Sequence, residues 1–513
     1  MIYSFTAALE KLPQSAVTLK ISSALSTIKS LLLKLFVSSI VPKENFHVKE
    51  DWAIIKHRKH GRQIKMEKEK RLFTNRALLA LIIPLVIESA LSLIVGMIDS
   101  VMVSSAGEAA VSGVSLIDTV MALIIYIFSA MAAGGAVVAG QYLGIGDRES
   151  AKRAAGELVW INGLISAAVT VLVFAMSGWI VGRLFGEIAA DVAASARDYL
   201  FYTAFSIPAI ALFNAGTAVF RTIGDTKTTM KISLLMNALN CAGNALLIYG
   251  FSMGAAGAAI STLAARWVAA ILIIALLLGQ RRELSIKRSF FHRFDWRMVK
   301  QIARVGIPGG IENGIFQLGK IVLLGLVATF GTTAITANAV TQTLAIIEVI
   351  PGGAMQLAIV TVIARCVGAG EFEQARYYNR RLILFTMLAN LGLGALMYLG
   401  LPLILGLYAL SAETTALIGS MFLWHTIGAV TFWPLSFVQA AALRAAGDVK
   451  YPMIMSVVSM WVFRFGGAYL LSTVLELGAV GIWISMAMLD WGFRAVVYAM
   501  RWRGGKWRDM KVI

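Results

Sequence analysis

Long apolar runs limit what this chain can fold into more than any other feature of the sequence. From about residue 77 to the C-terminus they recur, each roughly 20 residues or more and so long enough to cross a bilayer as an α-helix. The expected spans are 77–103, 110–142, 153–182, 198–220, 231–250, 254–279, 304–330, 335–364, 382–408, 415–443, 452–474 and 478–500. With 58% hydrophobic and 14% charged residues, the composition lies well outside the soluble range. We therefore predict an all-α polytopic membrane protein with twelve transmembrane helices, and exclude a soluble enzyme or a nucleic-acid binder.

The net charge of +18 then has a topological meaning. Lysines and arginines gather in the N-terminal tail, the C-terminal tail and the loops on one side of the predicted spans, whereas the loops on the other side carry only Arg183 and Arg197. We call the Lys/Arg-rich side the basic end. The positive-inside rule predicts that it is cytoplasmic, that both termini lie there, and that the protein is a multi-pass protein of the plasma (cytoplasmic) membrane.

The N-terminal tail, residues 1–76, contains no recognisable signal peptide. Its segment "VTLKISSALSTIKSLLLKLFVSSIV" spaces Leu and Ile at helical intervals, which predicts an amphipathic helix on the inner leaflet. A thirteenth span is less favoured, because Lys20, Lys29 and Lys34 would have to enter hydrocarbon. We expect a cytoplasmic or interfacial tail here, and a second cytoplasmic tail at 504–513.

An internal repeat divides the remaining chain. "IPLVIE" opens the first span and "IPGGIE" the seventh, so that Pro84 and Pro308 differ by 224 positions, and later "RTIGD" and "RAAGD" match at an offset of 223. This duplication predicts two pseudo-symmetric six-helix lobes, an N-lobe at 77–280 and a C-lobe at 304–503, joined by a cytoplasmic linker at 281–303. Two such lobes rocking about a shared site are typical of alternating-access transporters.

Residues found at equivalent positions of both repeats are expected to serve the fold, and Asp99 occurs in one repeat alone. Its counterpart at offset 224 is Leu323, so the repeated fold tolerates an apolar residue there. Asn240 and Asn244 lie four apart on one helical face, and Thr262 follows on the next span. A carboxylate with amide and hydroxyl neighbours suits a cation or a proton. The other interpretation is that the amides only pack one helix against another.

At these residues the chain resembles the multidrug and toxic compound extrusion (MATE) family over about residues 75–505. The similar motifs, in order, are "IPLVIE…VGMIDSVMVSSAGEAAVSGVSL", "GGAVVAGQYLGIGDRESAKRAA" and "FRTIGDTKTTMKISLLMNALNCAGNALLIYG…GAAGAAISTLAA". The resemblance implies cation-coupled export of amphipathic, often cationic compounds, driven by H⁺ or Na⁺. It also implies an ion-coupling site at Asp99, Asn240, Asn244 and Thr262, which would hold Na⁺ if Na⁺ is the coupling ion. At the position of Asn244 one branch of the family has aspartate, and the asparagine here resembles the NorM-like branch.

The second lobe departs from that branch. NorM-like members carry a glutamate eight residues after the helix-seven proline and an aspartate on helix ten, where this chain has Phe316 and Trp433. We therefore place coupling in the first lobe.

Four other acidic residues lie within predicted spans: Glu88, Asp118, Glu312 and Glu348. Glu88 and Glu312 either line the substrate cavity and attract a cationic substrate, or form hydrogen bonds inside each lobe. Asp118 and Glu348 are further candidates for the cavity wall.

The sequence thus predicts a secondary antiporter that is not an enzyme, needs no cofactor, and works as a monomer in the bilayer on small amphipathic molecules, without nucleic acid. The alternative is a lipid-linked saccharide flippase of the same wider fold group. A flippase is expected to place basic residues in the cavity for pyrophosphate. Four basic residues lie within the predicted spans: Arg266, Lys320, Arg464 and Arg494. None of them is expected beside Asp99, so the flippase is the less favoured interpretation.

Overall fold

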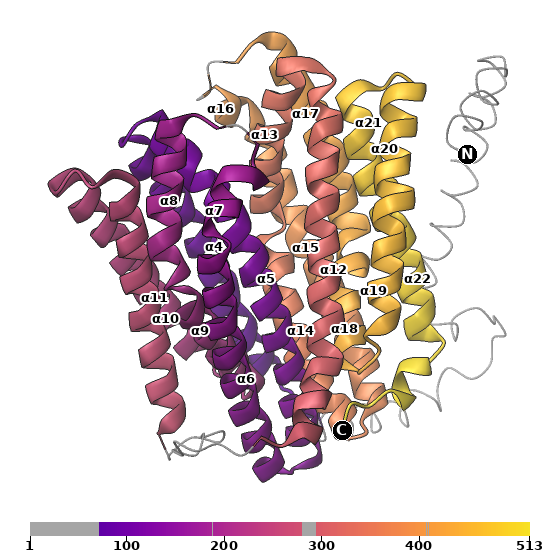
Figure 1. Cartoon of the computed structure of the whole chain (residues 1–513). Coiled ribbons are helices and arrows are strands. Elements are labelled where there is room, and N and C mark those ends of the chain that lie inside the picture. The colour runs from indigo at the N-terminus through magenta and orange to yellow at the C-terminus, as the bar shows by residue number, and fades with distance from the viewer. Residues whose placement is uncertain (1–70, 187, 280–293, 407, 409) are drawn as a thin grey trace, which may run out of the picture. The chain divides into compact units, whose positions relative to one another are not determined.

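The computed structural model describes residues 71–186, 188–279, 294–406, 408 and 410–513. Within these ranges the regular elements are all helical (Figure 1). The predicted amphipathic helix of the N-terminal tail and most of the predicted linker lie outside the described residues. Arg71–Ile513 forms one unit of contacts.

Six spans come from the first half of the chain. They are α4 (Asn75–Ser104), α5 (Glu108–Ile145), α6 (Arg148–Ala175), the bent pair α8 (Ala190–Ala204) and α9 (Ile207–Thr222), α10 (Thr226–Asn244) with its π-helical continuation η3 (Ala245–Gly250), and α11 (Gly254–Leu278). The short helices α7 (Ser177–Trp179) and η2 (Ile180–Leu184) lie between α6 and α8. Asp147 and Asp225 cap α6 and α10 by accepting hydrogen bonds from backbone N–H groups.

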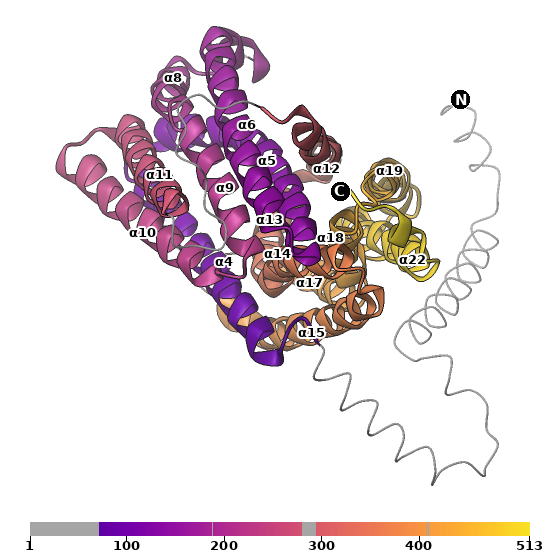
Figure 2. The same cartoon turned by 90° about the horizontal axis from the view of Figure 1, so that it is seen from below.

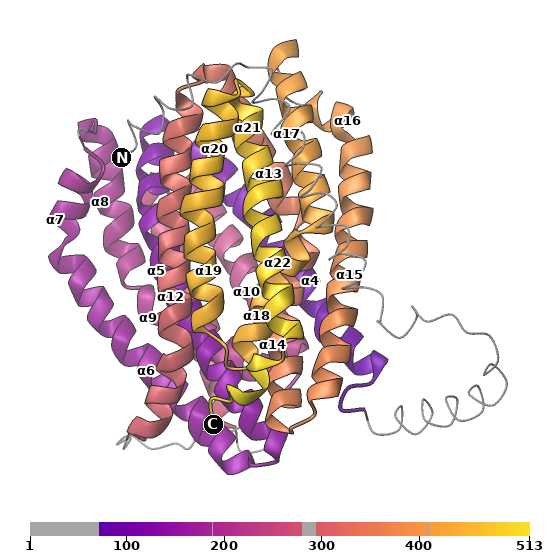
Figure 3. The same ribbon diagram turned by 90° about the vertical axis from the view of Figure 1, so that its right-hand side faces the viewer.

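The second half repeats this plan with more π-helix. Its spans are α12 (Trp296–Ala328), α13 (Gly331–Glu348) with α14 (Ile350–Gly368), α15 (Phe372–Leu399), the bent pair of α17 (Ala412–Thr431) with η4 (Pro434–Val438) and α18 (Gln439–Ala445), α19 (Lys450–Val458) with η5 (Ser459–Gly466), α20 (Gly467–Tyr469) and η6 (Leu470–Val474), and α21 (Gly478–Ile484) with η7 (Ser485–Asp490) and α22 (Trp491–Arg503). Figure 3 shows the last of these spans, α19 to α22, side by side. The short helices α16 (Leu401–Leu405) and η8 (Lys506–Asp509) complete the chain.

The predicted twelve spans are confirmed. Ten described helices are long and apolar enough to cross a membrane, and each of two helix pairs, bent by 48° and 50°, makes one further span. Three breaks have a common cause: Pro208, Pro351 and Pro434 stand in the first turn of α9, α14 and η4. Proline lacks the N–H that would continue the preceding helix, so the chain turns there. The predicted spans 198–220, 335–364 and 415–443 gave no indication of these breaks.

The two halves meet at the basic end, where α5 packs along α12 and α14 (Figure 2). Glycines bring the helices into backbone contact. A Cβ added at Gly134 of α5 would lie 2.7 Å from the Ile302 carbonyl oxygen, and one added at Gly306 of α12 would lie 2.9 Å from the Met131 Cα. Gly144 of α5 and Gly368 of α14 approach each other's helices in the same way. We call these four residues the glycine seam.

Hydrogen bonds reinforce this end of the interface. Arg365 Nε donates to the Thr222 carbonyl at 3.0 Å, and the Gln141 amide donates to the Ala445 carbonyl at 3.0 Å. The Gln141 side-chain oxygen also accepts from the Val512 N–H at 3.0 Å, which ties the C-terminal segment to α5. The halves are therefore locked together at the basic end in this structure.

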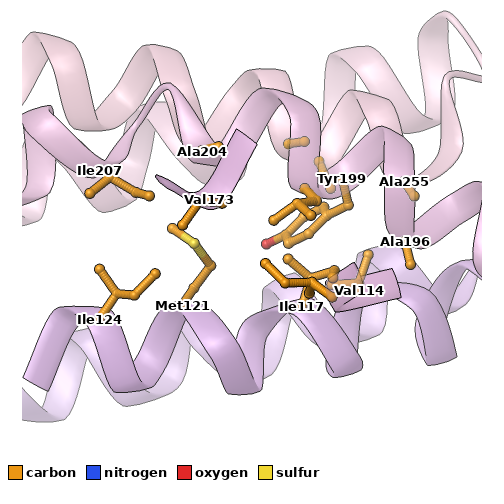
Figure 4. Packing of buried hydrophobic residues seen from close by; sticks show 14 of the residues in the cluster. Val114, Ile117, Met121, Ile124, Val173, Ala196, Tyr199, Ala204, Ile207 and Ala255 are labelled. Carbon is orange, nitrogen blue, oxygen red and sulfur yellow. The ribbon is translucent and has the colours of Figure 1, made fainter. Parts of the chain in front are cut away.

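An apolar cluster fills the first half toward the opposite end. It takes side chains from α5, α6, α8, α9 and α11, among them Val114, Ile117, Met121 and Tyr199 (Figure 4). Burial of these side chains fixes α8 against α5. The Tyr199 ring packs in this cluster, which fixes the position of its hydroxyl.

Candidate functional site

A polar cavity of about 230 Å³ lies among the helices of the first half. Its lining comes from α4, α5, α8, α9, α10 and α11: Asp99, Asp118, Tyr199, Ile210, Met236, Asn237, Asn240, Thr262, Ala265 and Arg266. The cavity thus gathers side chains that lie more than 160 positions apart in the sequence. We call it the Asp99 cavity.

Three of the four residues of the predicted ion site line this cavity, namely Asp99, Asn240 and Thr262, and Asn244 adjoins it through Asp99. The Asn244 side-chain amide donates a hydrogen bond to the Asp99 carboxylate. The Asn240 amide donates to Thr262 Oγ1 at 3.0 Å, and Ser261 Oγ donates to the Asn240 backbone carbonyl at 2.7 Å. Asn244 is fully buried, and its side-chain oxygen has no hydrogen-bond partner among the described residues. A carboxylate, a hydroxyl and a free amide oxygen are the ligand types that a hard cation prefers.

Asp118 of α5, which the sequence made a candidate for the wall of the substrate cavity, lines the Asp99 cavity. It accepts a hydrogen bond from the Tyr199 hydroxyl at 2.9 Å. The structure thereby brings two carboxylates, Asp99 and Asp118, into one polar site. Two negative charges in one cavity raise the free energy of the doubly ionised state, and a cation or a proton that enters the cavity lowers this free energy.

Arg266 corrects one expectation from the sequence, because it lies in the Asp99 cavity and interacts electrostatically with both carboxylates. Its guanidinium also donates to Ser206 Oγ at 2.8 Å. A signal was available: Arg266 follows Thr262 by four residues on α11, hence on the same helical face. For Tyr199 no such signal exists, because α8 approaches α5 only through tertiary packing.

Glu88 and Glu312 occupy equivalent positions in the two halves, and each forms an ion pair. Arg221 lies 3.0 Å from the Glu88 carboxylate, and Arg444 lies 2.9 Å from that of Glu312. Both arginines come from the repeated "RTIGD" and "RAAGD" motifs. These contacts favour the structural interpretation, in which each pair ties the first helix of a half to its fourth span. A substrate-cavity role for the two glutamates stays a prediction.

These interpretations predict different outcomes for Glu88→Gln. If the ion pair is structural, the free energy of unfolding falls by about 1–3 kcal/mol, because Arg221 loses a charged partner in a largely buried place. Unfolding in detergent, followed by circular dichroism, measures this change. Replacing both partners, as Glu88→Gln with Arg221→Met, should recover part of the loss. Impaired transport with unchanged stability would instead favour the cavity role.

Glu348 is fully buried in the second half and pairs with a histidine that the sequence did not single out. His425 Nδ1 lies 2.7 Å from a Glu348 carboxylate oxygen, and Thr426 Oγ1 donates to the same oxygen at 3.3 Å. The other carboxylate oxygen has no hydrogen-bond partner among the described residues. The His425 ring packs against Trp483 and Trp491. The only signal in the sequence was a histidine within a predicted span.

Comparisons with known proteins agree on one family. The MatE family model matches residues 84–246 and 308–470, one copy in each half of the chain. The transporter YisQ of Bacillus subtilis is 27% identical over 435 residues, covering 84% of this chain and 94% of its own. The probable multidrug resistance protein NorM of Thermotoga maritima is 25% identical over 456 residues, covering 87% and 96%.

Solved structures agree at the level of the fold. An outward-facing multidrug resistance MATE family transporter superposes with a TM-score of 0.78 at 21% identity, covering 84% of this chain and 95% of its own. A transporter of Pyrococcus furiosus matches with the same TM-score and coverage at 20% identity.

Proposed function

The chain belongs to the MatE family of transporters, and on that premise we propose that it is a secondary antiporter exporting amphipathic, often cationic drugs or metabolites in exchange for H⁺ or Na⁺. The observation that carries this proposal is the Asp99 cavity. Its two carboxylates, amide groups and hydroxyls offer one place where a proton or a sodium ion can be held inside the first half. Asp99 is the residue to which we assign coupling, with Asn240, Asn244 and Thr262 as its partners.

The coupling step follows from electrostatics. An empty Asp99 cavity holds two carboxylates and one guanidinium, and it gains stability when a cation binds. Binding would neutralise Asp99 and weaken the hydrogen bond that it accepts from Asn244, which joins α4 to α10. We propose that the resulting movement of these helices is what changes the fit between the two halves.

The position of the glycine seam indicates which side of the membrane is closed in this proposal. We place the basic end in the cytoplasm on the strength of the positive-inside rule. On this proposal the seam closes the pathway on the cytoplasmic side, as is expected of an outward-facing state. Opening of the seam would give the inward-facing state, in which substrate enters from the cytoplasm.

Separate ion gradients test the proposal. The full chain is reconstituted in vesicles, and uptake of a fluorescent organic cation is followed while either a pH gradient or a sodium gradient is imposed. We expect one of the two gradients to raise the initial rate well above that of vesicles without a gradient. Equal rates with and without both gradients, from protein that is folded by circular dichroism, would overturn antiport.

A further inference from the structure

A second cavity, of about 270 Å³, lies in the other half of the chain. Its lining comes from α12, α13, η5, α21 and η7: Lys320, Ile321, Leu323, Leu324, Val327, Asn338, Gln342, Arg464, Ile482, Trp483 and Met486. None of these described lining residues is acidic. We call it the Lys320 cavity.

The repeat relates this cavity to the Asp99 cavity. Leu323 is the counterpart of Asp99, and Gln342 is the counterpart of Asp118, both at an offset of 224. Both carboxylates of the first cavity are therefore replaced by uncharged residues in the second. The second cavity adds two cations, Lys320 and Arg464. Equivalent places in the two halves thus have opposite charge.

Among the described residues, one carboxylate, that of Asp490, lies beside a cation of the Lys320 cavity, and Arg494 shares it. Asp490 binds Arg494 through both carboxylate oxygens at 3.1 Å, whereas its contact with Arg464 Nη1 is longer, at 3.4 Å. Arg464 is 5% exposed, and its Nε has no hydrogen-bond partner among the described residues. Among the described residues, no carboxylate lies within 4.0 Å of Lys320 Nζ. Partial compensation comes from the Phe316 ring, 5.4 Å from Lys320 Nζ and 5.1 Å from Arg464 Cζ.

Neutral donors and apolar groups complete the site. Asn338 accepts a hydrogen bond from Trp483 Nε1 at 3.2 Å through its side-chain oxygen, which leaves its NH₂ group to donate elsewhere. Apart from Gln342, the remaining wall is apolar, with Ile321, Leu324 and Ile482 among its residues. Arg464 is a buried cation in a largely apolar membrane site, and such a charge is costly unless an anion joins it.

We propose that the Lys320 cavity binds the acidic group of the transported molecule, so that the substrates include amphipathic organic acids or zwitterions. Lys320 and Arg464 hold the carboxylate, sulfonate or phosphate group, and the apolar wall holds the body of the molecule. This inference rests on the proposed export function, and it assigns ion coupling to one half and recognition of the acidic group to the other.

Two probes with the same rings separate charge from hydrophobicity. Anilinonaphthalene sulfonate carries one sulfonate, and phenylnaphthylamine has the same aromatic body without it. The full chain is held in nanodiscs of zwitterionic lipid, and binding of each probe is followed by quenching of tryptophan fluorescence. For Lys320→Met we expect sulfonate binding to weaken about tenfold or more, as loss of a charged contact implies. Binding of phenylnaphthylamine should not change.

Two control variants and a competition experiment with an anionic lipid complete the test. Lys320→Arg should keep sulfonate binding, and Lys506→Met, which removes an exposed lysine of η8, should leave it unchanged. Equal sulfonate binding by Lys320→Met and the unsubstituted chain would overturn the inference. So would complete displacement of the sulfonate by phosphatidylglycerol in the nanodisc, since the cavity would then serve a lipid headgroup. If gradient-driven transport of organic cations persists in either case, the proposed antiport stands without this inference.

Discussion

Asp99→Asn should abolish ion-driven transport and leave the protein folded in the membrane. The substitution keeps the size of the side chain, and its amide can still meet Asn244, but it removes the negative charge that attracts the ion. One charge crossing 100 mV supplies about 2.3 kcal/mol, and a variant that cannot take up the ion cannot use this free energy. Initial uptake rates in vesicles with an imposed gradient measure the effect. We expect the variant to match vesicles without a gradient.

A matched control separates coupling from general loss of charge. Asp191→Asn removes an exposed carboxylate near the start of α8, outside the cavity, and should transport like the unsubstituted chain. Comparable thermal unfolding of both variants would show that neither effect comes from misfolding. If Asp99→Asn transports at the normal gradient-driven rate, coupling does not depend on this residue.

Gly368→Val should slow transport by a different route, because the added side chain pushes the two halves apart at the glycine seam. A Cβ at Gly368 would clash with the backbone carbonyl of Gln141 on α5, and a backbone atom cannot rotate away as the end of a side chain can. Overpacking of this kind costs about 1–3 kcal/mol, enough to disfavour the closed seam strongly. We expect the uptake rate to fall by about tenfold or more, in line with that free energy.

Gly392→Val is the matched control for the seam. Gly392 lies within α15, and a Cβ added there meets no atom within 4 Å. The same chemical change in a membrane helix should therefore leave transport nearly unchanged. Normal uptake by Gly368→Val would mean that closure of the seam is not needed for the cycle.

The sequence predicted the fold well because membrane spans and the repeat are local or strictly periodic signals. Apolar length revealed the twelve spans, and the family predicted from the motifs is confirmed by the family model. The helix breaks at Pro208, Pro351 and Pro434 were not predicted, because the length of an apolar run does not show where a helix is interrupted.

The candidate sites were harder to predict, because they depend on which helices meet. Asp99, Asn240, Asn244 and Thr262 could be grouped from the repeat and from helical spacing. Residues contributed by other helices carry no mark of their partners, as with Tyr199 beside Asp118 and His425 beside Glu348. The opposite charge of the two cavities becomes visible only when Lys320 and Arg464, which are 144 positions apart, are seen lining one space.

The glycine seam also bears on how readily the transporter can change state. At the seam the helices touch through backbone atoms whose carbonyls already accept hydrogen bonds within their own helix. The Arg365 backbone carbonyl, for example, accepts one from the Ala369 N–H at 3.0 Å. Parting these backbone contacts leaves none of their carbonyls unpaired, so the polar contacts to be broken at this end are the hydrogen bonds of the Arg365 and Gln141 side chains. Glycine surfaces also bury little apolar area, and so add little to the cost of separation. The backbone contact at the seam is therefore closely packed when the helices meet, yet it adds little to the free energy needed to separate them. Interdigitated side chains at the same place would bury more apolar area, so separating the helices would cost more free energy and the change of state would be slower.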